Sequence, residues 1–218
     1  MAKKIKREQT VGEEIGNAIT HGVMAIFGIF ILIYCLIHSH NWQQYLGSTI
    51  YGLSVVFLFT FSCLYHAITH KFTKTVIFKR FDHISIYLLI GGTYAPILLN
   101  LPTIQWPIGV LPAGLVIFII QWGLIAIGII AKSIWLNKYH WLHLIIYLAL
   151  GWTAVFFAKD VFEFNLTFLI LIFLGGLFYS FGVIFYINHK VKWFHFVWHI
   201  FVNIACILHS IAIILFIF

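Results

Sequence analysis

The chain has 218 residues, of which 62% are hydrophobic and 9% are charged, and its formal net charge is +7. So few polar residues cannot cover the surface of a soluble domain, and the composition therefore excludes a soluble enzyme or a soluble secreted toxin. The basic residues are spread over four short segments rather than one stripe, which argues against a nucleic-acid-binding protein.

Apolar runs of about twenty residues recur along the whole chain, and we recognise seven. Each run matches the ~30 Å hydrocarbon core of a bilayer, because a helix rises 1.5 Å per residue. The runs are continuous rather than alternating, which predicts helices and not barrel strands. The connections are short, so we expect one all-α integral membrane domain over residues 1–218, with a cytoplasmic lead-in at 1–17. The predicted spans are about 18–38, 45–67, 83–101, 108–131, 140–158, 164–187 and 194–217.

Lysine and arginine gather on one side of this predicted bundle. Twelve of them precede the first span or fall in connections that the topology places on the same side, whereas Lys159 alone falls on the other side. The positive-inside rule therefore predicts a cytoplasmic N-terminus and, with seven spans, an outside location for Phe218. The net charge is then explained by topology and by anionic headgroups, so we expect membrane lipids as partners, and neither nucleic acid nor a soluble protein.

Ionisable and hydroxyl side chains recur at the cytoplasmic ends of three predicted spans. A charge inside a bilayer costs about 2.5–3.5 kcal/mol on insertion scales, so an ionisable residue at such a position indicates function. His66 lies at the end of the second span, Asp82 at the start of the third, and His195 and His199 at the start of the seventh. Ser62 precedes His66 by one helical turn. The topology thus brings residues that are distant in sequence to one leaflet.

The three histidines of this group have the spacing of a metal site. His195 and His199 are four residues apart, so both imidazoles project from one helical face. With His66 they form a three-imidazole set of the kind that binds catalytic zinc and leaves a position for water. Asp82 would bind the metal, hold its water or accept a proton, and the Ser62 hydroxyl would reach that water.

Other interpretations of these residues stay open at this point. The chain has 12 histidines, so accidental pairs at a wet interface are common. His140 and His143 form another such pair on the cytoplasmic side, where we expect contact with lipid headgroups more than metal binding. Asp82 also fits as a helix N-cap or as a partner of Arg80. His209, deep in the last span, is expected to be a core histidine with its hydrogen bonds satisfied.

A second polar cluster comes just before the first predicted span. Glu14, Asn17 and His21 are spaced so that they share one stripe of a helix. The stripe either folds against the cytoplasmic mouth of the bundle and hydrogen-bonds the metal ligands, or is a polar lead-in with no such role.

Four motifs in order along the chain resemble the hemolysin III family, the bacterial branch of the progestin and adipoQ receptor superfamily. They are E-x-x-N-x-x-T-H at Glu14–His21, S-x-x-x-H at Ser62–His66, RFDHISIYLLIGGTYAP at 80–96 and H-x-x-x-H at His195–His199. The resemblance implies a seven-helix protein of the bacterial inner membrane with its N-terminus inside. It further implies that the three motif histidines bind zinc and that Asp82 lies close to the water at the metal.

The same resemblance implies an action on membrane lipids in membrane homeostasis, in the manner of ceramidase-type amide or ester hydrolysis. In that reading Asp82 is the general base and Ser62 orients the water or the oxyanion. A pore-forming cytolysin, as the family name suggests, and a non-enzymatic zinc-stabilised scaffold or sensor are the alternatives. Closure of the metal by four protein ligands would favour the scaffold, and an open position would favour the enzyme.

Overall fold

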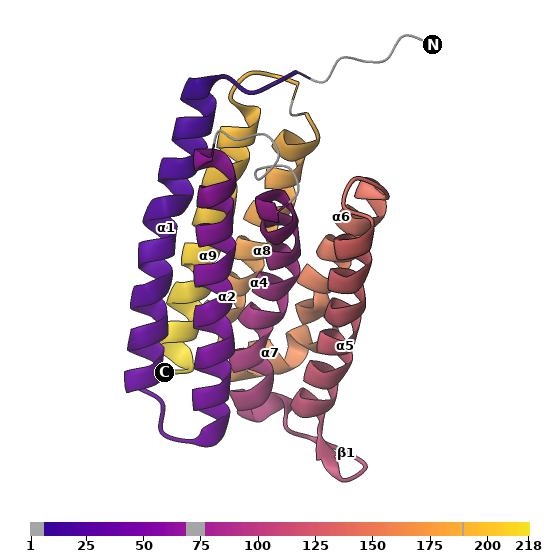
Figure 1. The fold of residues 1–218 in the computed structure, drawn as a ribbon. Coiled ribbons are helices and arrows are strands. Elements are labelled where there is room, and N and C mark those ends of the chain that lie inside the picture. The colour runs from indigo at the N-terminus through magenta and orange to yellow at the C-terminus, as the bar shows by residue number, and fades with distance from the viewer. Residues whose placement is uncertain (1–6, 69–76, 189) are drawn as a thin grey trace.

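A computed structural model describes residues 7–68, 77–188 and 190–218, and Figure 1 shows them as a bundle of long helices. Seven segments of these ranges are long and apolar enough to cross a membrane, which confirms the predicted all-α, seven-span fold. They are α1 (Val11–Ile37), α2 (Trp42–Ala67), α4 (Lys79–Asn100), α5 (Ala113–Ile134), the composite span His140–Phe164, α8 (Leu166–Ile187) and α9 (Phe194–Phe216). Five lysines of the predicted basic side lie outside the described ranges: Lys3, Lys4, Lys6, Lys71 and Lys74.

Helix α1 begins earlier than the predicted first span. A capping box starts it, in which the Thr10 hydroxyl accepts from the backbone N–H of Glu13 and the Glu13 carboxylate accepts from the backbone N–H of Thr10. The other Glu13 oxygen accepts from the backbone N–H of Trp193 at 2.6 Å, just before α9. The later part of the predicted lead-in, from Val11, is therefore helix, and Glu13 fixes the start of α1 against the residue before α9.

Among the other boundaries, α4 begins at Lys79 rather than near 83, and the two largest differences lie at the end of the bundle opposite the start of α1. Residues Pro107–Ile108 (β1) and Leu111–Pro112 (β2) pair as a small antiparallel hairpin after the short 3-10 helix η2 (Pro102–Ile104), so α5 begins at Ala113 rather than near 108. Gly109 provides the left-handed turn with a φ of 62°. The fifth span consists of α6 (His140–Gly151), the 3-10 helix η3 (Thr153–Phe157) and α7 (Ala158–Phe164).

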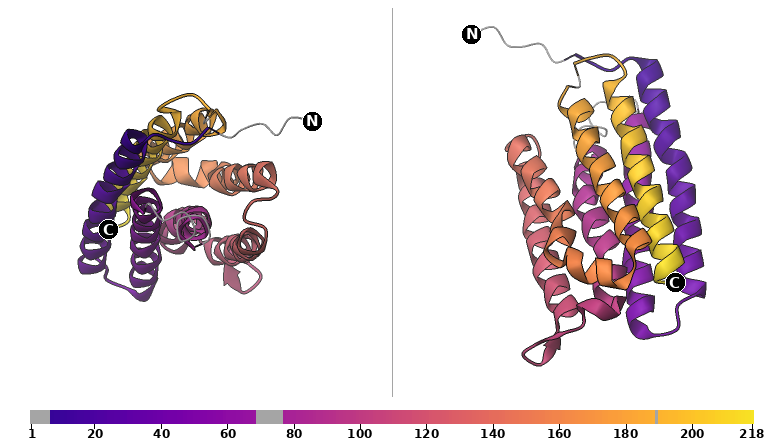
Figure 2. Two further views of the ribbon diagram at one scale, coloured as in Figure 1. Left: turned by 45° about the horizontal axis from the view of Figure 1, so that its top comes forward. Right: turned by 180° about the vertical axis from the view of Figure 1, so that it is seen from behind.

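The first and last helices of the chain pack against each other, so the two ends of the sequence meet within the bundle. Helix α1 contacts α2 and α9, α2 contacts α4, and α8 contacts α9; both views of Figure 2 show α9 beside α1. Glycine permits the close approach of α1 and α2, because a Cβ at Gly52 would come within 2.6 Å of Leu32 Cβ. The contact between the first and last helices places the start of α9 next to α1 and the end of α2.

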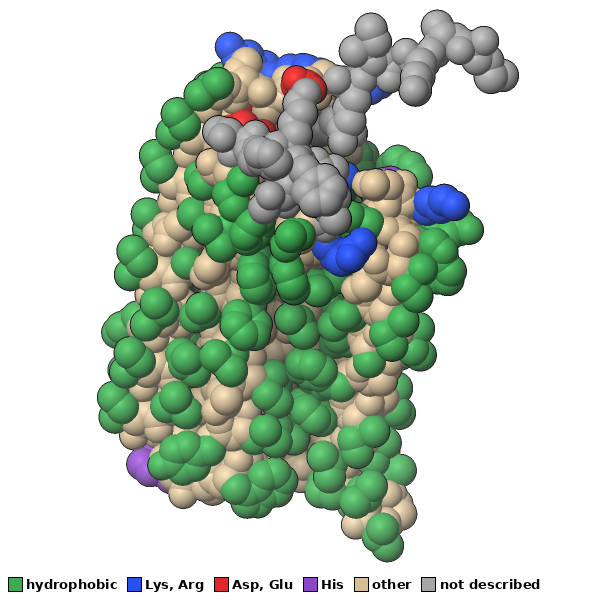
Figure 3. Space-filling view, viewed as in Figure 1, with side chains coloured by type: hydrophobic (Ala, Val, Ile, Leu, Met, Phe, Trp, Pro, Cys, Tyr) green, Lys and Arg blue, Asp and Glu red, His purple; other side chains and the backbone are tan. Residues whose placement is uncertain are grey.

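The surface agrees with a multi-pass membrane protein. Figure 3 shows hydrophobic side chains along the length of the bundle, with charged side chains gathered at the end where α1 begins. Lys159 lies in α7, at the opposite end. Exposed tryptophans mark both ends: Trp42, Trp106, Trp135, Trp141 and Trp193. The start of α1 and the end of α9 lie at opposite ends of the bundle (Figure 1), as seven spans require. That the basic end is cytoplasmic stays a prediction.

Candidate metal centre

Two helix ends supply the three histidines that the sequence analysis singled out. His66 lies in the last turn of α2, and His195 and His199 lie in the first two turns of α9. His66 and His199 are buried and His195 is half-buried. Since α2 ends and α9 begins at the same end of the bundle, the three imidazoles meet there although they are up to 133 residues apart in sequence.

The ring nitrogens of these histidines converge on one point. His66 Nε2 lies 3.4 Å from His195 Nε2, which lies 3.3 Å from His199 Nε2. The three candidate ligand atoms all lie within 4.8 Å of one another. A tetrahedral zinc with bonds of about 2.0–2.1 Å keeps neighbouring ligand atoms roughly 3.3–3.4 Å apart. These two separations therefore fit a single tetrahedral zinc ion held by three imidazoles.

Glu14 of α1 orients one of these rings. His66 Nδ1 donates to Glu14 Oε2 at 2.6 Å. With its proton on Nδ1, the neutral ring presents the Nε2 lone pair toward His195. A histidine that gives its other N–H to a carboxylate is the usual arrangement around a bound metal, because the carboxylate fixes the tautomer and raises the basicity of the ligand. The polar stripe of α1 thus hydrogen-bonds a candidate ligand.

The rest of that stripe packs beside the candidate ligands in other ways. The His21 ring stacks on the His199 ring, with centroids 3.6 Å apart and planes 10° from parallel. The edge of His21 also meets Phe59 at 5.0 Å. Asn17 is buried, and its amide donates to Gln9 Oε1 at 2.7 Å. His21 therefore fixes the ring plane of His199. The side-chain amide of Asn17 instead holds Gln9, just before α1, through its hydrogen bond.

Asp82 and Ser62 lie next to the histidine group but not in it. Asp82 falls outside the set of described residues whose ligand atoms lie within 4.8 Å of one another. It sits in the first turn of α4, whose N-cap is Phe78, so the N-cap interpretation was wrong. Its carboxylate lies 3.5 Å from His83 Nδ1 rather than against Arg80. Ser62 is buried on α2 and lines the same cavity as Asp82.

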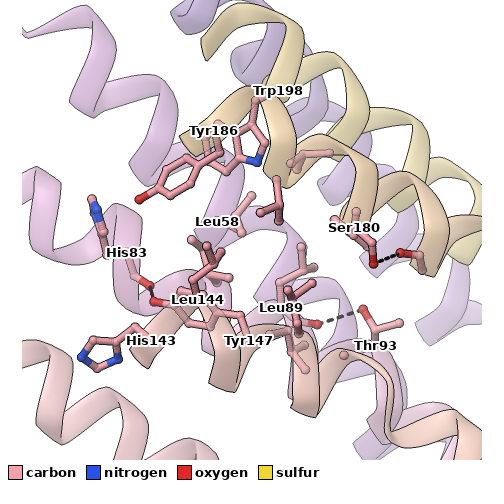
Figure 4. Close-up of a pocket in the computed structure, with 18 of the residues that line it drawn as sticks. Leu58, His83, Leu89, Thr93, His143, Leu144, Tyr147, Ser180, Tyr186 and Trp198 are labelled. Carbon is pink, nitrogen blue, oxygen red and sulfur yellow. Dashed lines mark hydrogen bonds between the residues drawn. The ribbon is translucent and has the colours of Figure 1, made fainter. Parts of the chain in front are cut away.

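A cavity of about 140 Å³ opens beside these two residues. Figure 4 shows apolar walls that include Leu58, Leu89 and Leu144, with Tyr186 and Trp198 over one side. At its deeper part lies His209, whose Nε2 is 2.9 Å from the Ile172 carbonyl oxygen. His209 is buried as expected, but among the described residues only its Nε2 has a hydrogen-bond partner and its Nδ1 has none, so the expectation that its hydrogen bonds are satisfied holds for one ring nitrogen only. The arrangement offers a polar end near the histidines and an apolar interior.

Several residues of the cavity were missed by the sequence analysis. Lys132 is buried and lines it, although its position near the end of an apolar run is typical of an ordinary interfacial lysine. His143, expected at the headgroups, is also buried, and its Nδ1 lies 2.8 Å from the Tyr87 hydroxyl. His140, one turn earlier, is exposed. An i, i+3 pair shows only that two rings share a helix face, so the different burial of the two rings was not predictable from spacing.

Comparison with known proteins agrees with the motif resemblance. The family model described as haemolysin-III related matches residues 9–210. A protein named hemolysin-3 homolog from Bacillus subtilis (strain 168) is 37% identical, covering 88% of this chain and 89% of that protein. Hemolysin-3 from Bacillus cereus is 38% identical, covering 93% and 91%. The human monocyte to macrophage differentiation factor is 30% identical, covering 94% and 84%.

Proposed function

This chain belongs to the haemolysin-III-related family of multi-pass membrane proteins, and on that premise we propose that it binds zinc and hydrolyses an amide or ester bond of a membrane lipid. One observation carries the proposal: His195 Nε2 lies at tetrahedral-ligand separations from the Nε2 atoms of His66 and His199, and the three ligand atoms lie within 4.8 Å of one another beside an apolar cavity. Zinc supplies a Lewis acid that polarises a carbonyl and makes a bound water more acidic. The physiological role that we infer is the adjustment of membrane composition in the bacterial plasma membrane.

Each polar residue around the histidine group has a separate part in this proposal. His66, His195 and His199 are the ligands, and Glu14 holds the His66 ring in the tautomer that leaves Nε2 free to bind. Asp82 lies beyond the ligand set, where its carboxylate accepts a proton from the attacking water. Ser62, next to it on the cavity wall, donates a hydrogen bond to the carbonyl oxygen as negative charge develops.

The cavity supports a lipid as the substrate. Leucine, isoleucine and aromatic side chains from α2, α4, α6, α8 and α9 line it, and they would bury acyl chains and exclude water. Its polar end lies at the same end of the bundle as the basic residues, where headgroups meet the hydrocarbon core. A lipid carbonyl, which sits at that depth, then approaches Asp82 and Ser62 without leaving the membrane.

The number of candidate ligands favours an enzyme over a purely structural metal. Among the described residues the group has three members, and Asp82 is not one of them. Three protein ligands leave a fourth tetrahedral position open for water or substrate, whereas structural zinc is closed by four protein ligands. The centre of the bundle is packed with buried side chains such as Tyr51, Phe59 and Ile213, which gives no support to a pore through a single chain.

Product release from a panel of ceramides, acyl amides and phospholipids tests the hydrolase. Purified protein in nanodiscs is incubated with each lipid and the products are identified by mass spectrometry, with the zinc content of every sample measured in parallel. Asp82→Asn should keep its zinc and lose nearly all turnover, because an amide cannot accept the proton. Ser62→Ala should reduce the rate by a smaller factor. If wild type and Asp82→Asn release the same product from every lipid, the metal only clamps α2 and α9 and the protein is a scaffold or sensor.

A further inference from the structure

Lys132 is the feature of the cavity that the proposed hydrolysis does not use. Its side chain is 1% exposed, yet it lines the cavity rather than packing away from it. Among the described residues, Lys132 takes part in no ion pair and no hydrogen bond through its side chain. A buried ammonium without a partner is costly, and buried lysines are almost always paired. The fold therefore keeps a buried lysine without a described counter-ion in the lining of the cavity.

An interfacial lysine that merely reaches for bulk lipid would look different. Such a side chain lies along the protein surface with its ammonium in the headgroup layer, and it is exposed. Lys138, six residues further along the chain and at the same end of the bundle, is exposed in this way. Lys132, on α5, is instead buried and lines the cavity, so it does not lie along the outer surface of the bundle.

Histidines from two other helices line the same cavity as Lys132, and the part of the lining that these residues form is called the basic wall below. His83 of α4 and His143 of α6 line the cavity, and Figure 4 shows both rings at one edge of it, with Thr93 and Ser180 at the other. The Tyr87 hydroxyl can donate to His143 Nδ1, which places the proton of the neutral ring on Nε2 as a donor. His140, at the start of α6, lines the rim. The basic wall is thus rich in donors and positive charge.

Negative charge near the basic wall is scarce. Asp82 is the only acidic residue among the described residues that line the cavity, and it lies against His83 at 3.5 Å. Lys79, one turn before His83, does not line the cavity, and its Nζ donates to Asn137 Oδ1 at 2.8 Å. The described lining therefore carries one lysine and one carboxylate, and the carboxylate lies against His83 rather than Lys132, which leaves the charge of Lys132 without a described counter-ion. An anion in the cavity would neutralise it.

We propose that Lys132 and His143 bind the phosphate of a lipid headgroup, so that the lipid handled at the neighbouring histidine group is a phosphate-bearing one rather than a neutral one. Lysine is a common partner of phosphate, and a charge-assisted hydrogen bond strengthens when it is removed from water. Lys132 lies two residues before the end of α5, at the same end of the bundle as His66 and Asp82. A phospholipid carries its phosphate and its acyl carbonyls at nearby depths, which suits one site for each along the same cavity.

This inference rests on the proposed action on lipids, but it is tested by binding and not by turnover. Purified protein in a maltoside detergent, which contains no phosphate, is titrated with dioctanoyl phosphatidic acid, with dioctanoylglycerol and with inorganic phosphate. Wild type should bind phosphatidic acid at least about tenfold more tightly than dioctanoylglycerol. Tighter or equal binding of inorganic phosphate would show that the site serves a free anion, and would overturn the lipid assignment.

Variants of two lysines identify the side chain responsible. Lys132→Met should weaken phosphatidic acid binding by about tenfold or more and leave dioctanoylglycerol binding unchanged. Lys132→Arg should retain most of the affinity. Lys138→Met, which removes the same charge from the exposed position, should bind like wild type. Equal binding of phosphatidic acid to wild type and to Lys132→Met would overturn the inference, provided that both melt at similar temperatures without lipid.

The two proposals fail separately. If no lipid is hydrolysed but phosphatidic acid binding depends on Lys132, the hydrolase is wrong and the phosphate site stands. If lipids are hydrolysed in an Asp82-dependent manner but Lys132→Met binds phosphatidic acid as wild type does, the phosphate site is wrong and the hydrolase stands.

Discussion

Glu14 Oε2 accepts a hydrogen bond of 2.6 Å from His66 Nδ1, across 52 residues of sequence. This bond joins the first turn of α1 to the last turn of α2 and fixes which nitrogen of His66 faces the other two histidines. It is the contact by which the polar stripe of α1 becomes part of the candidate metal centre.

Glu14→Gln should therefore lower zinc affinity by about 10- to 100-fold, the usual effect of losing a partner of a metal-bound histidine. The amide is nearly the same size but carries no charge, so it polarises the ring less. Zinc affinity is measured by competition with a chromogenic chelator. Glu163→Gln, which changes an exposed glutamate at the opposite end of the bundle, is the matched control and should bind zinc as wild type does. Unchanged affinity in Glu14→Gln would show that this carboxylate does not act through His66.

Zinc content itself should depend on the histidine group. Purified wild type should contain about one zinc per chain, and His199→Ala should lose most of it because two imidazoles hold zinc poorly. The variant should also melt at a lower temperature, since a bound metal stabilises the folded state by linkage. Elemental analysis and a thermal melt measure both quantities. His40→Ala, an exposed histidine beyond the end of α1, should leave both unchanged. Equal zinc content in wild type and in the variant with alanine at His66, His195 and His199 would show that these histidines do not bind the zinc.

Helix packing near Gly52 should tolerate no side chain. A Cβ there would come within 2.6 Å of Leu32 Cβ and 2.7 Å of Leu32 Cα, so α1 and α2 must separate to admit it. We expect Gly52→Ala to destabilise the protein by about 1–3 kcal/mol, the usual cost of overpacking. Gly123→Ala is the control, because a Cβ at Gly123 meets nothing within 4 Å and alanine favours the helix. Denaturation in detergent compares the two, and equal stabilities would contradict the close approach.

Sidedness is tested by reporter fusions. A reporter joined after Lys190, in the connection between α8 and α9, should report the cytoplasm, and one joined after Phe218 should report the outside. The physical reason is the concentration of lysine and arginine at the end where α1 begins. A cytoplasmic reporter at Phe218 would reverse the orientation and place the histidine group at the outer leaflet.

Much of the architecture was predictable because the bilayer imposes a strong constraint on composition. A span must be apolar over its whole length and satisfy its own backbone hydrogen bonds, so seven apolar runs predict seven helices. The boundaries were less predictable. Polar capping at Thr10 extends α1 into the predicted lead-in, and the hairpin at Pro107–Pro112 shortens the fourth span. Both depend on local hydrogen bonds rather than on hydropathy.

The sequence by itself determined the membrane class, the number of spans and the end of the bundle at which His66, His195 and His199 lie, because length, hydropathy and helical period are local properties of the chain. Only the tertiary structure decided that His195 Nε2 lies 3.3–3.4 Å from the Nε2 atoms of His66 and His199, that Glu14 hydrogen-bonds His66, and that Lys132 lines a cavity. Those facts depend on the rotation of each helix about its axis and on the contact between α1 and α9. Rotation and contact follow from the packing of side chains across the whole bundle, which no single segment of sequence specifies.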